Sequence, residues 1–125
     1  MEELLRDLKS QYDASRIVGF DLTCPPSSLP LKGLLINSTS LGLHPGDPSP
    51  ISLELAGENL KVFDMVYNRE ETSLVDAASE VGLRSVNGLS MLVWQGVRSL
   101  EIWSGEQVPA SIMMTAARRA LTDQY

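Results

Sequence analysis

The apolar run from Leu31 to Ile36 constrains the fold of this chain more than any other stretch. The run does not alternate between apolar and polar positions, and it ends abruptly at Asn37. A short strand of this kind is typical of a parallel sheet that is covered on both faces. The run from Val62 to Tyr67 and a brief run at residues 84–86 predict two further strands. Helical patterns separate and follow these strands, so the sequence predicts an α/β layered fold with mainly parallel strands.

Four segments have the spacing of amphipathic helices. The first covers residues 2–12, the second begins at Thr72 or Ser73 and ends at Gly82, the third runs over residues 87–105, and the fourth follows Pro109. Their apolar positions are Leu4, Leu5, Leu8 and Tyr12; Leu74, Ala77, Ala78 and Val81; Leu89, Leu92, Val93, Val97 and Leu100; and Ile112, Met113, Ala116 and Ala120. Residues 16–21 predict another short strand, and the proline-rich stretches at 22–30 and 43–50 predict loops.

Composition excludes several classes of partner. The chain has 125 residues, enough for one domain, and its net charge of −6 disfavours nucleic acid and anionic membranes. No apolar run approaches the ~18 residues that cross a bilayer. The chain begins with Met1 and two glutamates and has one cysteine, Cys24, which indicates the cytoplasm. With one histidine, His44, and no clustered carboxylates, no metal site is expected.

Polar residues follow each of the three predicted strands. The clusters are Asn37-Ser38-Thr39-Ser40, Tyr67-Asn68 and Asn87-Gly88. In open parallel sheets, ligands bind in the crevice beyond the carboxyl ends of the strands. We therefore expect the three clusters to face one site.

Gln95 lies beside the apolar stripe of the third predicted helix. It shares a side face with Met91, Arg98 and Ile102, at three- and four-residue spacing. Helical side chains lean toward the N-terminus, so the Gln95 amide is expected over Met91, facing the space above Gly88. The amide either binds a polar ligand there or bridges a contact within the helix.

Two other side chains have alternative interpretations. Tyr67 can pack its ring on a flat ligand while its phenol donates and accepts hydrogen bonds. Asp64, inside the second strand, is either a functional acid or a hydrogen-bonded structural carboxylate. The nine glycines include no Gly-x-Gly turn, and the sequence has neither a nucleophile elbow nor a phosphate loop. The chain therefore lacks the turn with which dinucleotide-binding folds approach a pyrophosphate.

Four motifs in order resemble the C-terminal part of the shikimate dehydrogenase family. Residues 34–42, with Asn37-Ser38-Thr39, resemble its Asn-Ala-Thr-Ser/Pro-x-Gly loop. Residues 62–68 resemble its Asp-Met-x-Tyr strand, and residues 71–74 the Glu-Thr-Pro-Leu segment after it. Residues 87–96 resemble its Asp-Gly-Leu-Gly-Met-Leu-Val-x-Gln-Ala helix start, and residues 103–105 the Trp-Thr-Gly that ends this helix.

The resemblance implies a partial Rossmann-like three-layer sandwich whose first βαβ unit and N-terminal catalytic domain are missing. Residues 1–125 then form a single domain. In it, residues 1–86 are a partial dinucleotide-binding unit, and residues 87–125 are helices that would pack on the missing catalytic domain. The implied reaction is NADPH-dependent interconversion of 3-dehydroshikimate and shikimate, with NADP binding weakened because the Gly-rich loop is absent. The family's catalytic lysine and aspartate belong to the missing domain, so this chain has no catalytic residue and is expected to be inactive alone.

The resemblance also assigns roles residue by residue. The expected substrate-binding residues are Gln95 and Tyr67, and the expected cofactor-binding residues are Asn37, Ser38, Thr39, Met65, Gly88 and Met91. The chain departs from the family pattern at three positions: Ser90 replaces a glycine, Asn87 replaces an aspartate, and Arg69 replaces a proline.

Several functional interpretations stay open. The chain is either the C-terminal portion of an oxidoreductase acting on shikimate or a related cyclohexane acid such as quinate, or a non-catalytic nucleotide- or protein-binding remnant. Exposed apolar residues are expected on the last two helices, namely Trp94, Trp103, Met113 and Met114. Such a patch predicts a homo-oligomer or a complementary N-terminal chain as partner.

Overall fold

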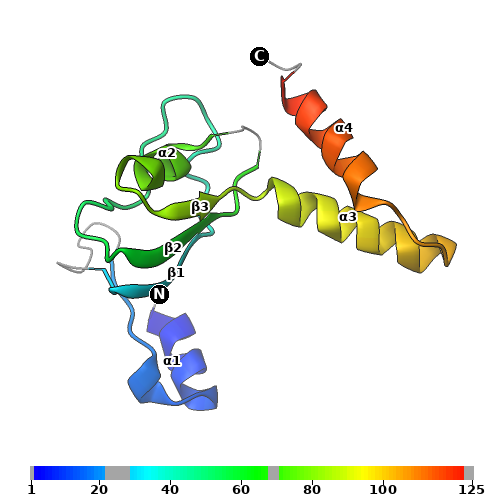
Figure 1. Cartoon of the computed structure of the whole chain (residues 1–125). Coiled ribbons are helices and arrows are strands. Elements are labelled where there is room, and N and C mark those ends of the chain that lie inside the picture. Colours follow the sequence, from blue (N-terminus) through cyan, green and yellow to red (C-terminus); the bar gives the residue numbers. More distant parts are fainter. Residues whose placement is uncertain (1, 22–28, 68–70, 123–125) are drawn as a thin grey trace.

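The computed structural model describes residues 2–21, 29–67 and 71–122, and its centre is a three-stranded parallel sheet (Figure 1). The strands are β1 (Lys32–Asn37), β2 (Asn59–Asp64) and β3 (Arg84–Val86), in the spatial order β1-β2-β3. Lys32 pairs with Asn59 and Asn37 with Asp64, while Val62 pairs with Ser85. The carboxyl ends of β1, β2 and β3 therefore lie at one edge of the sheet, where Asn37, Tyr67 and Asn87 follow them; Asn68 lies outside the described residues.

Helix α2 (Ser73–Glu80) covers one face of the sheet and forms the core with it. The Thr72 side chain caps this helix by accepting a hydrogen bond from Val75 N at 3.3 Å. Gly82 follows with a φ of +74°, a left-handed conformation that glycine adopts without strain. Leu74 and Ala78 are fully buried, whereas Val81, which was expected in the same stripe, is 44% exposed. The core residues are Leu53, Leu60, Val62, Leu74, Ala78 and Leu83.

The opposite face of the sheet is open. Side chains alternate along a strand, so the residues between those that meet α2 point to this second face. We call it the open sheet face, and it consists of Lys32, Leu34, Ile36, Lys61, Phe63, Arg84 and Val86. Leu34 is 59% exposed, Ile36 53% and Val86 55%. The prediction that β1 is covered on both faces is thus wrong, because no described element packs against its second face.

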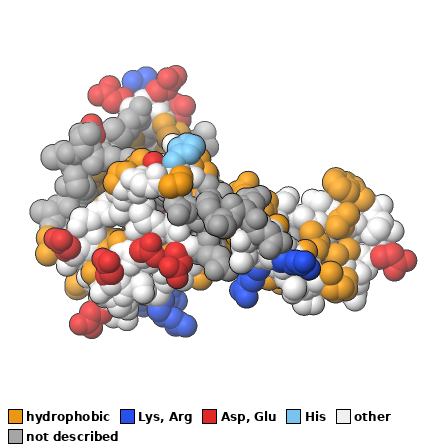
Figure 2. All heavy atoms as spheres, turned by 90° about the horizontal axis from the view of Figure 1, so that it is seen from above, with side chains coloured by type: hydrophobic (Ala, Val, Ile, Leu, Met, Phe, Trp, Pro, Cys, Tyr) orange, Lys and Arg blue, Asp and Glu red, His pale blue; other side chains and the backbone are white. Residues whose placement is uncertain are grey.

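Helices α3 (Leu89–Ser104) and α4 (Ala110–Thr122) pack on each other and extend from the sheet as a helical arm (Figure 1). The arm's hydrophobic side chains are visible on its surface in Figure 2. In α3, Leu89, Val93 and Val97 are buried as expected, but Leu100 is 41% exposed. The stripe expected in α4 is wrong at Ile112, Ala116 and Ala120, which are exposed. The half-buried α4 residues are Ala110, Met113, Met114, Ala117 and Leu121.

The N-terminal segment forms helix α1 (Glu2–Gln11) and a 3-10 turn, η1 (Ala14–Arg16). Residues 16–21 do not form the predicted strand; Asp21 alone makes a single β-bridge. A strand is stable only beside a neighbour that accepts its backbone hydrogen bonds, and residues 17–20 have no such neighbour among the described residues. Cys24 and most of the loop predicted at residues 22–30 lie outside the described residues. Within the described residues, no helix combines the length and apolar character needed to span a bilayer.

Candidate functional site

A buried polar network joins the carboxyl ends of β1 and β2 to the start of α2. Asp64 is completely buried, and its Oδ2 accepts a hydrogen bond from Thr72 Oγ1 at 2.6 Å. Its Oδ1 accepts from Asn37 Nδ2 at 2.9 Å and from Val66 N at 3.1 Å. Because three donors bind both oxygens of a fully buried side chain, the contacts favour the structural interpretation of Asp64.

The same network shapes the loop after β1. Asn37 Oδ1 accepts from Thr39 N at 3.0 Å and from Thr39 Oγ1 at 2.7 Å. Asn37 Nδ2 also donates to the Leu41 carbonyl at 3.1 Å, while Thr39 Oγ1 accepts from Leu41 N. The polar atoms of Asn37 and Thr39 are therefore committed to the loop itself. Ser38 between them is exposed.

Asp47 closes the far end of this loop. Its Oδ2 accepts from His44 N at 2.9 Å and from Gly42 N at 3.0 Å. The His44 N–H holds the pKa of the Asp47 carboxyl below its usual value, and the Gly42 N–H lowers it further. The His44 ring is exposed in the loop, and no group of residues in the described part of the chain has a metal-binding arrangement.

Met65 and Gly88 are brought together where β2 ends and α3 begins. Gly88 N donates to the Val66 carbonyl at 3.0 Å, and Met65 N donates to the Asn37 carbonyl at 3.0 Å. A Cβ at Gly88 would lie 2.2 Å from the Met65 carbonyl oxygen, so only glycine allows this approach. Three of the residues expected to bind cofactor, Asn37, Met65 and Gly88, are thus joined through their backbones.

Asn87 lies just before Gly88, the N-cap residue of α3, and its Oδ1 accepts from Leu89 N at 3.2 Å. An aspartate would accept the same bond, which accounts for the substitution seen in the sequence. Ser90 lines a groove of about 400 Å³ between the arm and α2, together with Glu71, Val75, Met114 and Arg118 among others. Its added side chain therefore has space.

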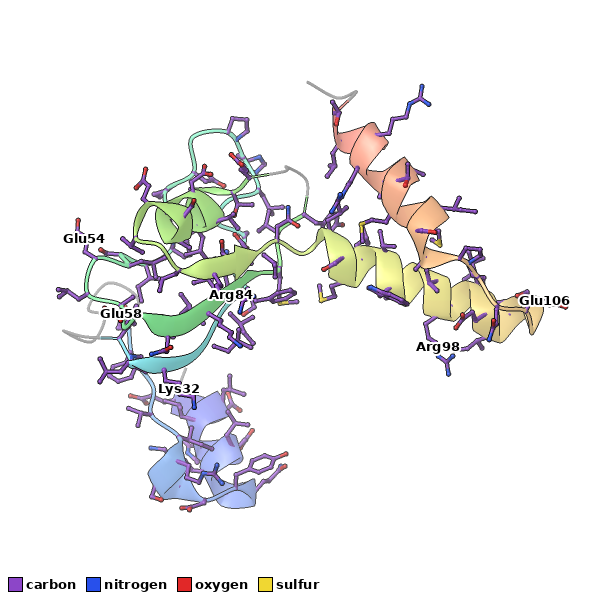
Figure 3. All side chains as sticks on the ribbon, in the orientation of Figure 1. Lys32, Glu54, Glu58, Arg84, Arg98 and Glu106 are labelled. Carbon is purple, nitrogen blue, oxygen red and sulfur yellow. The ribbon has the colours of Figure 1, made fainter. Side chains whose placement is uncertain are left out.

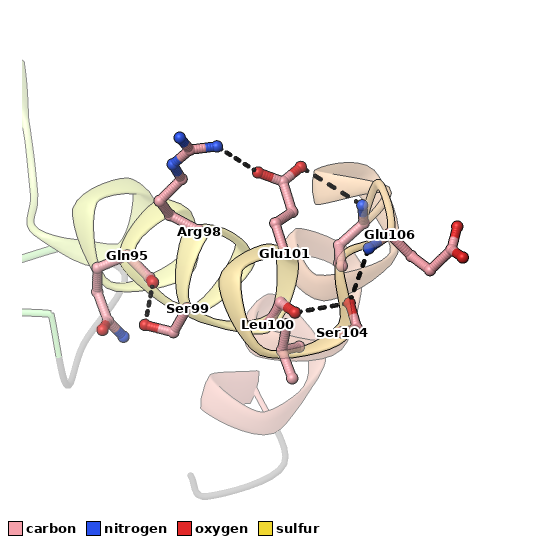
Figure 4. Close-up of polar contacts among 8 residues, drawn as sticks. Gln95, Arg98, Ser99, Leu100, Glu101, Ser104 and Glu106 are labelled. Carbon is pink, nitrogen blue, oxygen red and sulfur yellow. Dashed lines mark hydrogen bonds and ion pairs between the residues drawn. The ribbon is translucent and has the colours of Figure 1, made fainter.

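Gln95 and Met91 lie on the exposed side of α3. Gln95 Nε2 donates to the Leu92 carbonyl at 2.9 Å. The backbone carbonyl of Gln95 accepts from Ser99 Oγ at 2.9 Å (Figure 4). The amide thus makes the helix-bridging contact that was one of its two interpretations. Because the side chain is exposed, exchanging this bond for one to a ligand would cost little. Met65, Tyr67 and Met91 are 39%, 43% and 40% exposed. Asn68 and Arg69 lie outside the described residues.

Sequence reasoning did not foresee the roles of Thr72 and Asp47. Thr72 was expected only as a helix cap, and the signal for its second role is that a buried acid in a strand requires hydrogen-bond donors nearby. For Asp47, the signal was a short acidic side chain placed just after Pro45-Gly46, where aspartate commonly accepts from turn amides.

Comparison with known proteins relates this arrangement to one family. Residues 88–118 match the model of the shikimate 5'-dehydrogenase C-terminal domain. The chain is 36% identical over 120 residues to a shikimate dehydrogenase (NADP(+)) of Methanosarcina acetivorans, covering 95% of this chain and 43% of that protein. It is 34% identical over 117 residues to the enzyme of Carboxydothermus hydrogenoformans, covering 92% of this chain and 41% of that protein.

Solved structures agree. Shikimate 5-dehydrogenase from Thermus thermophilus, in complex with NADP(H) and shikimate, superposes with a TM-score of 0.63 at 38% identity, covering 74% of this chain and 37% of that one. The chain is thus similar to the C-terminal portion of shikimate dehydrogenases. A 5-ketofructose reductase of Gluconobacter also superposes, with a TM-score of 0.67 at 32% identity, over 74% of this chain and 34% of that one. The chain spans about two-fifths of the length of the curated shikimate dehydrogenases it matches.

The parallel sheet agrees with the fold of these neighbours, and the Thermus thermophilus protein was solved with NADP(H) and shikimate bound. Met65 and Met91 offer partly exposed apolar side chains, Gly88 is buried against the Met65 carbonyl, and Ser38 is exposed on the loop after β1. These groups suit a flat ring and its adjoining ribose. The pyrophosphate end would need the Gly-x-Gly turn that the sequence does not contain.

Proposed function

We propose that this chain is the cofactor-side portion of an NADP-dependent oxidoreductase that interconverts 3-dehydroshikimate and shikimate in the cytoplasm. The observation that carries the proposal is the joining of Asn37, Met65 and Gly88 through backbone contacts at the carboxyl edge of the sheet. Similarity to shikimate dehydrogenases over more than nine-tenths of the chain supports it.

In this proposal, Gln95 and Tyr67 hold the hydroxyl groups of the substrate, and Met65 and Met91 pack on the nicotinamide with Gly88 between them. Asn37, Ser38 and Thr39 form the loop along the cofactor, with Asn37 and Thr39 fixing its shape. The nicotinamide supplies or accepts the hydride when it is bound. Hydride transfer to a ketone also needs a proton donor beside the oxygen, and no residue assigned to this site provides one. We therefore propose that the chain works with a complementary N-terminal chain and is inactive alone.

A complementation assay tests the proposal. The chain is mixed with a separately expressed N-terminal portion of a shikimate dehydrogenase relative, and shikimate oxidation with NADP is followed as NADPH absorbance. We expect no turnover from either part alone and measurable turnover from the mixture. A stable complex without turnover would refute the enzymatic function and favour the non-catalytic module. Parallel assays with quinate and with NAD establish the substrate and cofactor preference.

Gln95→Ala tests the site within the active complex, with Gln107→Ala as the matched control because Gln107 is an exposed amide in the turn between α3 and α4. Loss of a hydrogen bond to substrate should lower kcat/KM for shikimate by about 10- to 100-fold, with little change in the KM for NADP. Equal activity of the two variants would remove Gln95 from the site.

A further inference from the structure

The open sheet face combines apolar and cationic side chains in two cross-strand rows. Leu34, Lys61 and Arg84 are paired in one row, and Ile36, Phe63 and Val86 in the other. Five of these residues, all except Ile36, line a shallow groove of about 610 Å³. In parallel sheets such a face is normally covered by a helix, because the strands carry apolar side chains on both faces of the sheet and these side chains need burial.

The charge on this face is unusual for an acidic chain. Lys32, Lys61 and Arg84 lie on it without a carboxylate, although the whole protein has a net charge of −6. Figure 3 shows Lys32 on β1 and Arg84 on β3. Lys61 and Arg84 stand directly opposite each other on neighbouring strands, a like-charge pairing that is unfavourable unless an anion lies near. The salt bridge found within the described residues is elsewhere, between Arg98 and Glu101.

Helix α1 has the complementary surface. It buries none of its residues fully, and among the described helices and strands it contacts only η1. Its half-buried Leu5 lies against Gly19 in the segment that follows. Leu4 and Tyr12, at the two ends of its apolar stripe, are each 64% exposed. Glu2, Glu3 and Asp7 supply exposed acidic side chains on the same helix. The helix also carries exposed Arg6 and Lys9, so its three acids and two bases give it a net charge of −1. Each chain therefore presents one uncovered cationic sheet face and one weakly acidic amphipathic helix whose apolar stripe is partly exposed.

We propose that α1 of a second copy of this chain docks on the open sheet face, and that the exchange is reciprocal. A two-fold dimer satisfies both unmatched surfaces at once, since each copy gives a helix and receives one. The apolar stripe of α1 packs on Leu34, Ile36 and Val86, and its acidic residues meet Lys61 and Arg84. This interface is separate from the exposed side of α3 that carries Gln95 and Met91.

Charge reversal tests the contact by sedimentation equilibrium across a range of chain concentrations. Glu3→Lys with Asp7→Lys should weaken dimerisation by about tenfold or more, as should Lys61→Glu with Arg84→Glu. A mixture of the two reversed chains should recover part of the loss. The matched control is Glu54→Lys with Glu80→Lys, because both glutamates are exposed and lie off the open sheet face, and it should leave dimerisation unchanged. All exchanged residues are exposed or lie on the surface, and circular dichroism verifies the fold.

Crosslinking then identifies the occupant. In a Cys24→Ser background, a chain with Leu4→Cys is mixed with a chain carrying Ile36→Cys and treated with a bismaleimide. We expect a covalent dimer from the mixture. A third chain carries both Leu4→Cys and Ile36→Cys. The proposal would be overturned by a monomer at every concentration or by a dimer that neither charge reversal weakens. It would also be overturned if crosslinking occurred only within the chain that carries both cysteines. The last result would assign the face to the chain's own α1.

Discussion

At the scale of single residues, Asp64 holds the site together. Three donors from three segments converge on its carboxylate, and none is exposed to water. Asp64→Ala leaves Thr72, Asn37 and Val66 without their acceptor, so unfolding should become easier by about 2–4 kcal/mol. Urea denaturation followed by circular dichroism measures the loss. Asp76→Ala, on the exposed side of α2, should change stability by less than about 0.5 kcal/mol. A similar effect of both substitutions would show that the network is not stabilising.

Asp47 gives the loop after β1 a dependence on pH. The N–H groups of His44 and Gly42 depress the pKa of Asp47 in the folded chain. The ionised carboxylate therefore stabilises the loop fully at pH values above the ordinary aspartate pKa. The contribution is lost as the pH falls through the lower, folded pKa. We expect NMR to show faster solvent exchange of the His44 and Gly42 amides only when the pH falls below the folded pKa of Asp47. Asp47→Asn should remove this acid-dependent step. A step that persists in the variant would assign it to another carboxyl group.

At the scale of elements, Gly88 is the joint between the sheet and the arm. Gly88→Ala places a Cβ against the Met65 carbonyl, a backbone atom that cannot rotate away. The expected destabilisation is about 2–3 kcal/mol, with displacement of α3 from β2. Gly33→Ala is the matched control, because its nearest neighbour, Leu60 Cδ1, would be at an ordinary 3.7 Å. Thermal unfolding of the two variants provides the measurement, and a tolerated alanine at residue 88 would contradict the close approach.

The packing face of α4 offers a second test at this scale. Met113 Cε lies 3.1 Å from the position of a Cβ on Gly96, which places its side chain against α3, whereas Ile112 is 67% exposed. Met113→Ser should lower the stability of the arm by about 1–2 kcal/mol, while Ile112→Ser should be nearly neutral. Hydrogen exchange of the α4 amides distinguishes them. The opposite ranking would support the stripe expected from the sequence.

The elements that could be predicted from the sequence are those whose signals are local. The cap at Thr72, the turn at Gly82 and the apolar run of β1 depend on neighbouring residues, and the structure confirms them. The strand predicted at residues 62–67 exists but is displaced, because β2 covers Asn59–Asp64. The prediction of a strand at residues 16–21 is wrong because a strand needs a hydrogen-bonded neighbour, and the local sequence pattern carries no information about that neighbour. In α4 the failure has a similar cause. With one neighbouring helix to pack against, several apolar faces of similar width compete, and periodicity alone does not choose among them.

In the candidate site, too, some features could be predicted from the sequence and others could not. The meeting of the polar clusters at one sheet edge follows from parallel topology and was predictable. The commitment of Asn37 and Thr39 to the loop, and the bond from Gln95 to Leu92, depend on side-chain geometry that spacing does not encode. The ligand roles of these residues stay predictions, which the complementation assay addresses.

At the scale of the whole molecule, the arm and the sheet are two packing units joined at Gly88. Between elements, α4 contacts α3 alone, and the core around Leu74 includes no residue of the arm. Leu74→Ala leaves a cavity in that core and should cost about 2–5 kcal/mol. If the units open separately, native-state hydrogen exchange will show lower protection in β2 and α2 of the variant and unchanged protection in α4. Equal loss of protection in α4 would mean that the chain unfolds as one cooperative unit. Separate opening would leave the arm free to reorient on a partner while the sheet keeps its shape.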